Sequence, residues 1–172
     1  MTVTIANVSL PQIKGALSAT TDEIALIITF NIIATAVATP MTGWLSTRFG
    51  RRNTLIWAVI GFTASSFLCG TATSLEQLVF YRVLQGACGA PLPPLCQAIV
   101  VDAYPKEKIG KANAIFGMGV VLGPILAPTL GGYLSETYSW RWVFYMMVPC
   151  GLASLIGVLI FIRSHINDKR AD

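Results

Sequence analysis

The chain has 172 residues, of which 54% are hydrophobic and only 12% are charged, and its mean hydropathy is +0.66. Soluble globular domains carry roughly 25% charged residues, so this composition excludes an ordinary soluble domain. The formal net charge of +4 does not indicate nucleic-acid binding, because the Lys and Arg residues are scattered over short loops and form no basic stripe with interleaved aromatic residues.

Long apolar stretches dominate the sequence. Five of them are long enough, as helices, to cross a bilayer core of about 30 Å. The predicted spans are 24–47, 54–75, 78–101, 112–134 and 142–162. In hydrocarbon, an apolar run of about twenty residues can bond all its backbone groups within itself only as an α-helix. The chain is therefore predicted to be an all-α membrane protein.

Residues 1–13 are apolar like the end of a helix but would extend only about 20 Å at 1.5 Å per residue. A signal peptide is the alternative, yet no basic region precedes the apolar stretch and Pro11 is followed by no small-residue cleavage pattern. We therefore expect these residues to belong to a first span that begins before this sequence, which would make six spans.

A short polar turn joins the second and third predicted spans. Its candidate gating residues are Gly43, Arg48, Gly50, Arg51 and Arg52. Gly43 would let helices approach closely, and Gly50 would take the positive φ that a helix-ending turn requires. The arginines would pair with helix C-termini or nearby acidic groups. From these residues alone, a positive-inside anchor is at least as well supported as a gating latch.

The fourth predicted span contains a charge, Arg82. An intramembrane Arg costs about 2.5 kcal/mol or more, so it should face the bundle interior or water and find a partner, the alternative being an Arg that snorkels to the outer interface. Gln85 shares its face, and Gly86 with Ala90 would let another helix come near. Three prolines follow, so this helix should be kinked or unwound at mid-membrane. They are Pro91, Pro93 and Pro94.

The fifth predicted span carries small residues at a period of four. The stripe is Gly119, Gly123, Ala127 and Gly131, with Gly110 and Gly132 extending it and Pro124 and Pro128 beside it. Such a stripe predicts a groove on one helix face that permits close packing, while the prolines bend the helix.

Amides at membrane depth are either interhelical hydrogen-bond partners or contacts to a substrate in a cavity. The candidates for the cavity are Asn7, Asn31, Gln97 and Asn113. No metal or redox site is expected, because the four cysteines lie inside predicted spans without a C-x-x-C pair. We expect no enzyme either, since His165, the single histidine, lies in a polar tail.

Basic residues indicate the orientation. If the spans alternate, nine Lys and Arg residues fall on one side and two on the other, which are Lys14 and Arg141. The nine are Arg48, Arg51, Arg52, Lys106, Lys108, Lys111, Arg163, Lys169 and Arg170. The positive-inside rule then puts the 48–53 turn, the 102–111 loop and the C-terminal tail in the cytoplasm.

These motifs together resemble the major facilitator superfamily. The 43–52 turn resembles its G-x-L-a-D-r-x-G-r-r signature, and the segment from Arg82 to Ala90 resembles its R-x-x-q-G motif. Gly110, Gly119, Gly123 and Pro124 match the antiporter pattern G-x8-G-x3-G-P. The segments 4–11, 139–144 and 148–149 are similar to those of EmrB/QacA-like drug:proton antiporters.

The resemblance implies an N-terminal six-helix half of two three-helix repeats, packed against a C-terminal half that this sequence lacks. It implies efflux of drug-like or amphipathic small molecules across the cytoplasmic inner membrane, driven by a proton gradient without a cofactor. The turn would latch the inward-closed state, Arg82, Gln85 and Gly86 would take part in proton coupling, and the fifth span would resist leak. A periplasmic adaptor and an outer-membrane channel would be partners in a Gram-negative cell.

Two departures weaken this implication. Thr47 stands where the turn signature has an acidic residue, and Thr2 stands where relatives have an intramembrane Asp. The coupling carboxylate would then lie in the C-terminal half, or the coupling would differ. The alternatives are an exporter of one metabolite or siderophore on the same scaffold and a membrane assembly protein or truncated remnant without transport.

Overall fold

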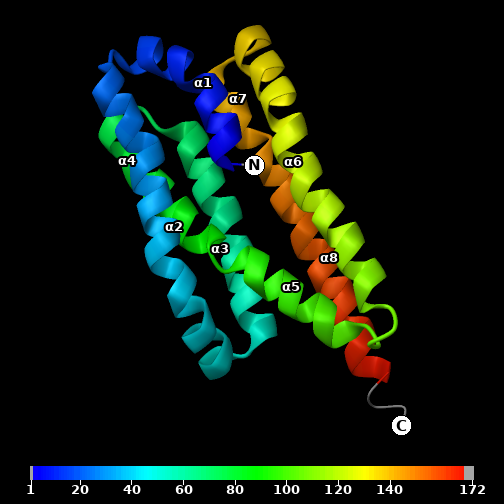
Figure 1. Cartoon of the computed structure of the whole chain (residues 1–172). Coiled ribbons are helices and arrows are strands. Elements are labelled where there is room, and N and C mark those ends of the chain that lie inside the picture. The colour runs from blue at the N-terminus through cyan, green and yellow to red at the C-terminus, as the bar shows by residue number, and fades with distance from the viewer. Residues whose placement is uncertain (1, 169–172) are drawn as a thin grey trace.

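The computed structural model describes residues 2–168, and the regular structure within them is helical (Figure 1). The helices are α1 (Thr2–Leu17), α2 (Thr21–Phe49), α3 (Arg51–Thr71), α4 (Leu75–Gly89), α5 (Leu92–Ala103), α6 (Ile109–Thr137), α7 (Trp140–Tyr145) and α8 (Met147–Asp168).

Five helical stretches of the described chain are long and apolar enough to cross a membrane. They are Thr21–Phe49, Arg51–Thr71, Leu75–Ala103, Ile109–Thr137 and Trp140–Ile160, so α4 with α5 and α7 with α8 each count as one stretch. Large apolar side chains cover their outer surfaces, as with Trp57, which is 72% exposed. Exposed apolar side chains are favourable where the surrounding solvent is lipid. The chain is therefore an all-α multi-pass membrane protein, as predicted.

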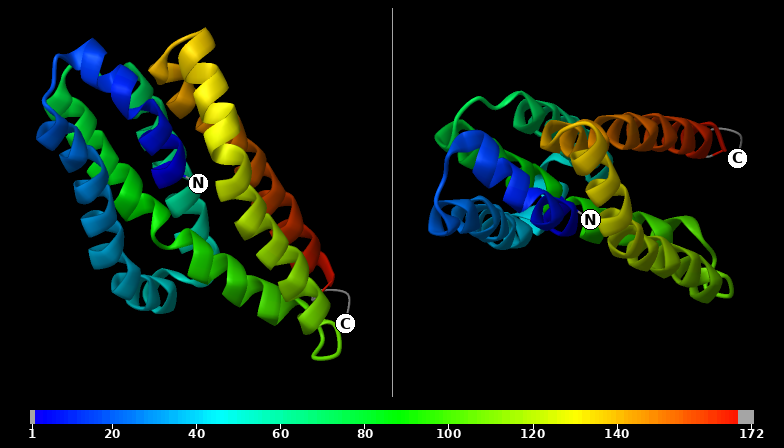
Figure 2. Two further views of the ribbon diagram at one scale, coloured as in Figure 1. Left: turned by 45° about the horizontal axis from the view of Figure 1, so that its top comes forward. Right: turned by 90° about the horizontal axis from the view of Figure 1, so that it is seen from above.

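The connections alternate between the two ends of the bundle (Figure 1, Figure 2). The α2–α3 turn, the α5–α6 loop and the last turn of α8 lie at one end, and the α1–α2, α3–α4 and α6–α7 connections lie at the other. The basic residues of the first two connections thus share one end of the molecule. Lys169 and Arg170 fall outside the described residues, as does the side chain of Arg163.

The packing pattern has an internal symmetry. The helix α2 packs along α4, α1 packs along α6, and α3 contacts both α7 and α8. If α1 is numbered as the first of six spans, α4 with α5 forms the fourth span and α6 is the fifth. The first span then meets the fifth just as the second meets the fourth. Two repeats of three helices produce this pairing.

Local sequence signals account for several helix ends. Thr20 and Glu23 form a capping box at the start of α2, in which the Thr20 N–H donates to Glu23 Oε2 over 2.8 Å. Gly50, between α2 and α3, has a φ of 84°, the positive value that was predicted for it. Ser74 caps α4 by accepting a hydrogen bond from the Gln77 N–H.

The fourth span is interrupted where the sequence predicts it. The helix α4 ends at Gly89 and α5 begins at Leu92, with Pro91 between them. Proline lacks the backbone N–H that would continue the ladder of α4, and it is well tolerated at the start of a helix. The interruption lets α5 leave α4 in a new direction (Figure 1).

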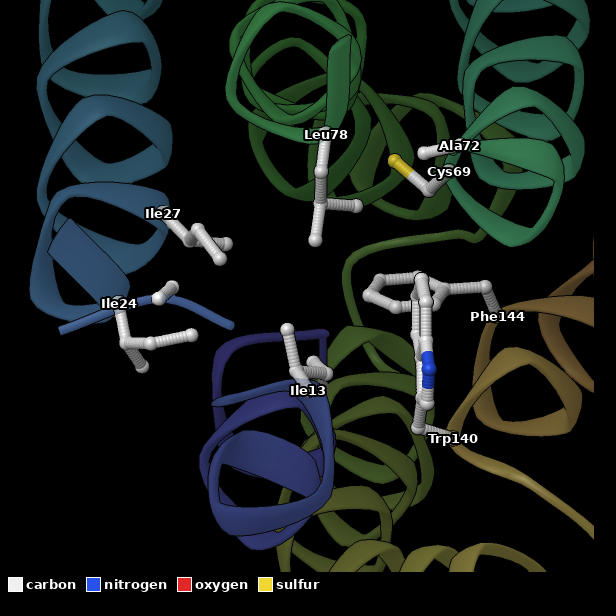
Figure 3. Close-up of a cluster of buried hydrophobic side chains, with 9 residues drawn as sticks. Ile13, Ile24, Ile27, Cys69, Ala72, Leu78, Trp140 and Phe144 are labelled. Atoms are coloured by element: carbon white, nitrogen blue, oxygen red, sulfur yellow. The ribbon is translucent and has the colours of Figure 1, made fainter. Parts of the chain in front are cut away.

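A cluster of buried apolar side chains closes the end of the bundle at which α1 meets α2 (Figure 3). Its members are Ile13, Ala19, Ile24, Ile27, Cys69, Ala72, Leu78, Trp140 and Phe144. Because they come from α1, α2, α3, α4 and α7 and the connections between them, this outer cluster joins the helices of both repeats. It lies immediately beside the candidate site.

Candidate functional site

Arg82 is the charged side chain around which the candidate site is built. It is 0% exposed, and its Nη1 donates to Gln85 Oε1 over 2.5 Å. Gln85 Nε2 in turn donates to Ser66 Oγ over 2.8 Å, which carries the network from α4 to α3. Arg82 is thus held inside the bundle, as one of the two sequence interpretations predicted, and does not snorkel to the interface.

The guanidinium of Arg82 is incompletely satisfied. Its Nε and Nη2 are buried and have no hydrogen-bond partner, and the ring of Phe144 lies 5.8 Å from its Cζ. The ion pair among the described residues joins Arg51 and Asp102. No acidic side chain in that part of the chain pairs with Arg82. A buried cation without a carboxylate partner is costly. A hydrogen-bond acceptor that reached Nε or Nη2 would therefore be bound favourably.

The main chain of α4 at this site is held by α2. Asn31 Nδ2 donates to the Arg82 carbonyl over 2.7 Å, and Thr35 Oγ1 donates to the Gly86 carbonyl over 3.2 Å. A Cβ at Gly86 would lie 2.5 Å from the Asn31 carbonyl oxygen, so only glycine permits this approach. Asn31, Arg82, Gln85 and Gly86 therefore form one packed unit with Thr35 and Ser66, and the last two were not predicted from the sequence.

The other amides predicted to line a cavity do not join this unit. Asn7 and Gln97 are exposed, and Asn113 is half-buried with a buried Oδ1 that has no hydrogen-bond partner. Asn31, in contrast, is buried and bonds across helices, which is the structural interpretation of its amide. The role of Asn7, Gln97 and Asn113 as substrate contacts stays a prediction.

The turn at the opposite end of the bundle carries the predicted gating residues. Arg51 donates from Nη1 to Asp102 Oδ2 and forms an ion pair between the start of α3 and the end of α5. Arg48 stacks on Trp44 with its Cζ 5.4 Å from the ring centroid, and Arg52 is exposed. Asp102 is exposed as well, so this ion pair lies at the surface of the bundle.

At Gly43 the expected close helix contact is absent among the described residues. Gly43 was expected to permit a close helix approach, but it lies on the exposed face of α2 and an added Cβ would meet nothing within 4 Å. At the position of the missing acidic residue, Thr47 donates its hydroxyl to the Trp44 carbonyl over 2.8 Å. Thr47 is therefore satisfied within α2 and makes no contact of the kind a carboxylate would make.

The small-residue stripe of α6 divides into a packed part and an open part. Gly123, Ala127 and Gly131 are buried, and Ala127 packs with Val143 of α7 and Met147 of α8. Beside them, a Cβ added at Gly132 would lie 3.5 Å from Val8 of α1, while Pro124 is exposed and α6 runs through it unbroken.

Gly110 and Gly119 are both exposed, and a Cβ at either would meet nothing within 4 Å. The expectation that the groove continues through these two glycines was therefore wrong for contacts within this chain. The cause is the geometry of the partners, because the helix α1 and the short helix α7 meet α6 toward its C-terminal part.

The cysteines are free and have no common site. Cys69 is buried in the outer cluster, Cys88 and Cys96 are half-buried, and Cys150 is exposed. The described residues contain no group of three or more side chains that could hold a metal ion. The chemistry available at the site is accordingly that of one buried guanidinium, its amide and hydroxyl partners, and backbone carbonyls.

Comparisons with known proteins agree with the motifs. A sequence profile described as the Major Facilitator Superfamily matches residues 1–172. The chain is 40% identical over 160 residues to the multidrug export protein EmrB of Escherichia coli, covering 93% of this chain and 31% of that protein. It is 42% identical over 151 residues to the fatty acid resistance protein FarB of Neisseria gonorrhoeae, covering 88% of this chain and 30% of that protein.

The chain thus spans about a third of the length of the curated relatives it matches. A crystal structure of a D-xylose-proton symporter superposes with a TM-score of 0.78 at 13% identity, covering 98% of this chain and 49% of that one. At this identity the likeness concerns the fold, and it extends over about half of the solved protein.

Proposed function

The chain belongs to the major facilitator superfamily, and we propose that it is the N-terminal half of an exporter that moves drug-like or amphipathic molecules outward in exchange for protons. A second six-helix half would face it, and substrate would bind between the two halves by alternating access. The proposed location is the cytoplasmic inner membrane, with the α2–α3 turn and the C-terminal tail in the cytoplasm.

The observation that carries the proposal is the buried guanidinium of Arg82, which has no carboxylate partner among the described residues. A helix that only anchors a protein in the membrane does not need a buried Arg, whose charge costs about 2.5 kcal/mol or more within the bilayer. Ionisable groups inside a membrane bundle mark ion or substrate paths by default. Two unpartnered nitrogens, Nε and Nη2, leave Arg82 able to accept an acidic or water partner during a cycle.

A proton carrier is still needed, because Arg itself keeps its proton in proteins. The carrier would be a carboxylate outside the described residues, with Arg82 responding to its charge. Proximity of a cation favours the ionised form of a carboxylate, so a movement of Arg82 toward or away from it would drive release or uptake of the proton.

The ion pair between Arg51 and Asp102 suits a latch at the cytoplasmic end. It connects two helices that would have to separate or slide if the two repeats rearrange. Exposed ion pairs contribute about 0–1 kcal/mol, which is small enough to be broken in each cycle. We assign the turn this role, with Arg48 and Arg52 as further cytoplasmic charges.

The proposed substrates follow from the names of the relatives, which are called a multidrug export protein and a fatty acid resistance protein. Both names suggest amphipathic organic molecules and not sugars or ions. In a Gram-negative host, a periplasmic adaptor and an outer-membrane channel would complete the route out of the cell.

The test is efflux of a cationic dye from a pump-deficient host that expresses the intact protein. We expect dye to leave only while a proton gradient is present, and dissipation of the gradient by a protonophore should stop it. Proton-independent efflux would contradict the coupling. Export of one metabolite without any dye would favour a dedicated exporter, and absence of all transport would favour an assembly role.

A further inference from the structure

An apolar groove of about 270 Å³ opens between α5 and α8. Its walls include Cys96 and Ile99 of α5, Tyr104 at the end of that helix, and Gly157 and Val158 of α8. Leu55 of α3 also lines the groove, and it is itself buried among Val59 and Leu95. The groove is therefore closed on its inner side by α3 and open along its length.

At Gly157 the groove leaves space that no described residue fills. A Cβ at Gly157 would meet nothing within 4 Å, whereas a Cβ at Gly151 of the same helix would lie 2.1 Å from Thr63 Oγ1. Glycine inside a helix costs about 0.5–1 kcal/mol relative to alanine. Gly151 has a packing reason for that cost, and Gly157 has none within the described chain.

The groove follows the C-terminal part of α5. Tyr104 is exposed at the end of α5, where a tyrosine suits the headgroup level. At 1.5 Å per residue, Cys96 lies about 12 Å further along α5. Half of a hydrocarbon core is about 15 Å, so a groove of this length fits within one leaflet.

Three cations stand close in sequence to residues that line the groove. Arg52 stands one helical turn before Leu55, on the same side of α3, and forms no hydrogen bond or ion pair with a described residue. Lys106 and Lys108 follow Tyr104 and are exposed without a carboxylate partner in the described chain. Glu107 is the acidic residue among them, and Asp102 is already held by Arg51.

We propose that this groove binds one acyl chain of an anionic phospholipid, whose phosphate lies among Arg52, Lys106 and Lys108. Apolar walls of this depth suit an acyl chain, and unpaired cations at the interface suit an anionic headgroup. The site is separate from Arg82, which lies in α4 on the other side of the α4–α5 break. The inference concerns a bound lipid and stands whether or not the transported compound has been identified.

Native mass spectrometry of the intact protein tests this proposal. Protein purified in detergent and stripped of lipid is mixed with dioleoylphosphatidylglycerol or dioleoylphosphatidylcholine, and the lipid retained on it is counted. We expect preferential retention of phosphatidylglycerol. Arg52→Gln should reduce that preference by about fivefold, which corresponds to roughly 1 kcal/mol for one basic residue at an anionic surface.

Gly157→Leu should remove the retained phosphatidylglycerol because its side chain fills the groove. Gly117→Leu is the matched control, since a Cβ at Gly117 also meets nothing within 4 Å but lies in α6, outside the groove. Modification of Cys96 by N-ethylmaleimide, quantified against exposed Cys150, locates the lipid. Phosphatidylglycerol should slow the reaction at Cys96 and leave Cys150 unchanged.

Three results would overturn the proposal. Equal retention of the two lipids with unchanged behaviour of Arg52→Gln would show that headgroup charge has no part. Unaltered retention in a folded Gly157→Leu protein would place the lipid elsewhere. Protection of Cys96 by the exported dye and not by phosphatidylglycerol would make the groove a path for substrate.

Discussion

Arg82 and Gly86 are one turn apart on α4 and have opposite requirements. Arg82 brings a large charged group into the bundle, where it bonds to Gln85 and lies over the ring of Phe144. Gly86 removes all side-chain bulk so that Asn31 of α2 can reach the backbone of α4. The charged side chain and the close helix contact therefore lie within one turn of the same helix.

Replacing Arg82 separates a functional role from a structural one. In Arg82→Ala we expect proton-dependent efflux to fall to background while the protein still inserts, because the charge is lost but the apolar helix remains. The measurement is dye efflux normalised to protein in the membrane. Lys14→Ala, at an exposed residue near the end of α1, is the control. Efflux at the wild-type level in Arg82→Ala would remove Arg82 from the coupling mechanism.

The cost of filling the contact at Gly86 is measurable as stability. Gly86→Ala places a methyl group 2.5 Å from the Asn31 carbonyl oxygen, so α2 and α4 must move apart. Overpacking of this kind costs about 1–3 kcal/mol. We expect a lower temperature of thermal unfolding in detergent, whereas Gly117→Ala, which adds its methyl group in open space, should be neutral or stabilising. An unchanged unfolding temperature in Gly86→Ala would contradict the close approach.

At the scale of the elements, α6 shows how one periodic pattern serves two surroundings. Its four-residue repeat is uniform in the sequence, but Gly123, Ala127 and Gly131 are buried and Gly119 is exposed. The packed part meets α1, α7 and α8, whereas a Cβ added at Gly119 would meet nothing within 4 Å among the described residues. A regular stripe therefore does not imply a regular interface.

Two leucine substitutions distinguish these parts of α6. Gly123→Leu should lower the yield of folded protein, because its side chain enters a buried position. Gly119→Leu should leave the yield near that of the wild type, since a side chain there has open space within this chain. Size-exclusion chromatography of protein extracted from membranes compares the two yields. Equal yields would show that the burial of Gly123 has no consequence for folding.

For the whole molecule, both ends of the bundle contain buried apolar side chains, and one end adds an exposed ion pair. The outer cluster closes one end with apolar side chains from both repeats. At the other end, α3 and α5 are joined by an exposed ion pair, with 53% of the Arg51 side chain and 60% of the Asp102 side chain accessible. The helices α3 and α5 also share buried apolar contacts through Leu55, Val59 and Leu95, so the ion pair adds only about 0–1 kcal/mol to that end.

The latch at that end can be tested by exchanging its charges. Arg51→Asp and Asp102→Arg each place like charges together, so we expect each to reduce efflux while changing the unfolding temperature little. The double variant restores an opposite pair and should recover part of the efflux. Dye efflux is compared among the wild type, the two single variants and the double variant, as in a double-mutant cycle. Absence of any recovery would show that the ion pair itself is not what efflux requires.

The sequence by itself determined the membrane class, the helical spans and the turn at Gly50, because each depends on local physics. Apolar length sets a span, missing backbone donors break a helix at proline, and positive φ selects glycine. For Arg82 the sequence left a buried and a snorkelling position open, and the structure selects the buried one.

Only the tertiary structure decided which residues meet. Asn31 and Arg82 are 51 residues apart in sequence, as are Arg51 and Asp102, and both pairs form because α2 and α3 pack beside α4 and α5. The packing of α6 against α1 and α7 likewise buries Gly123, while Gly43 and Gly119 stay open, although all three are small residues in apolar helices. Partner choice depends on how whole helices cross, and no local pattern of residues contains that information.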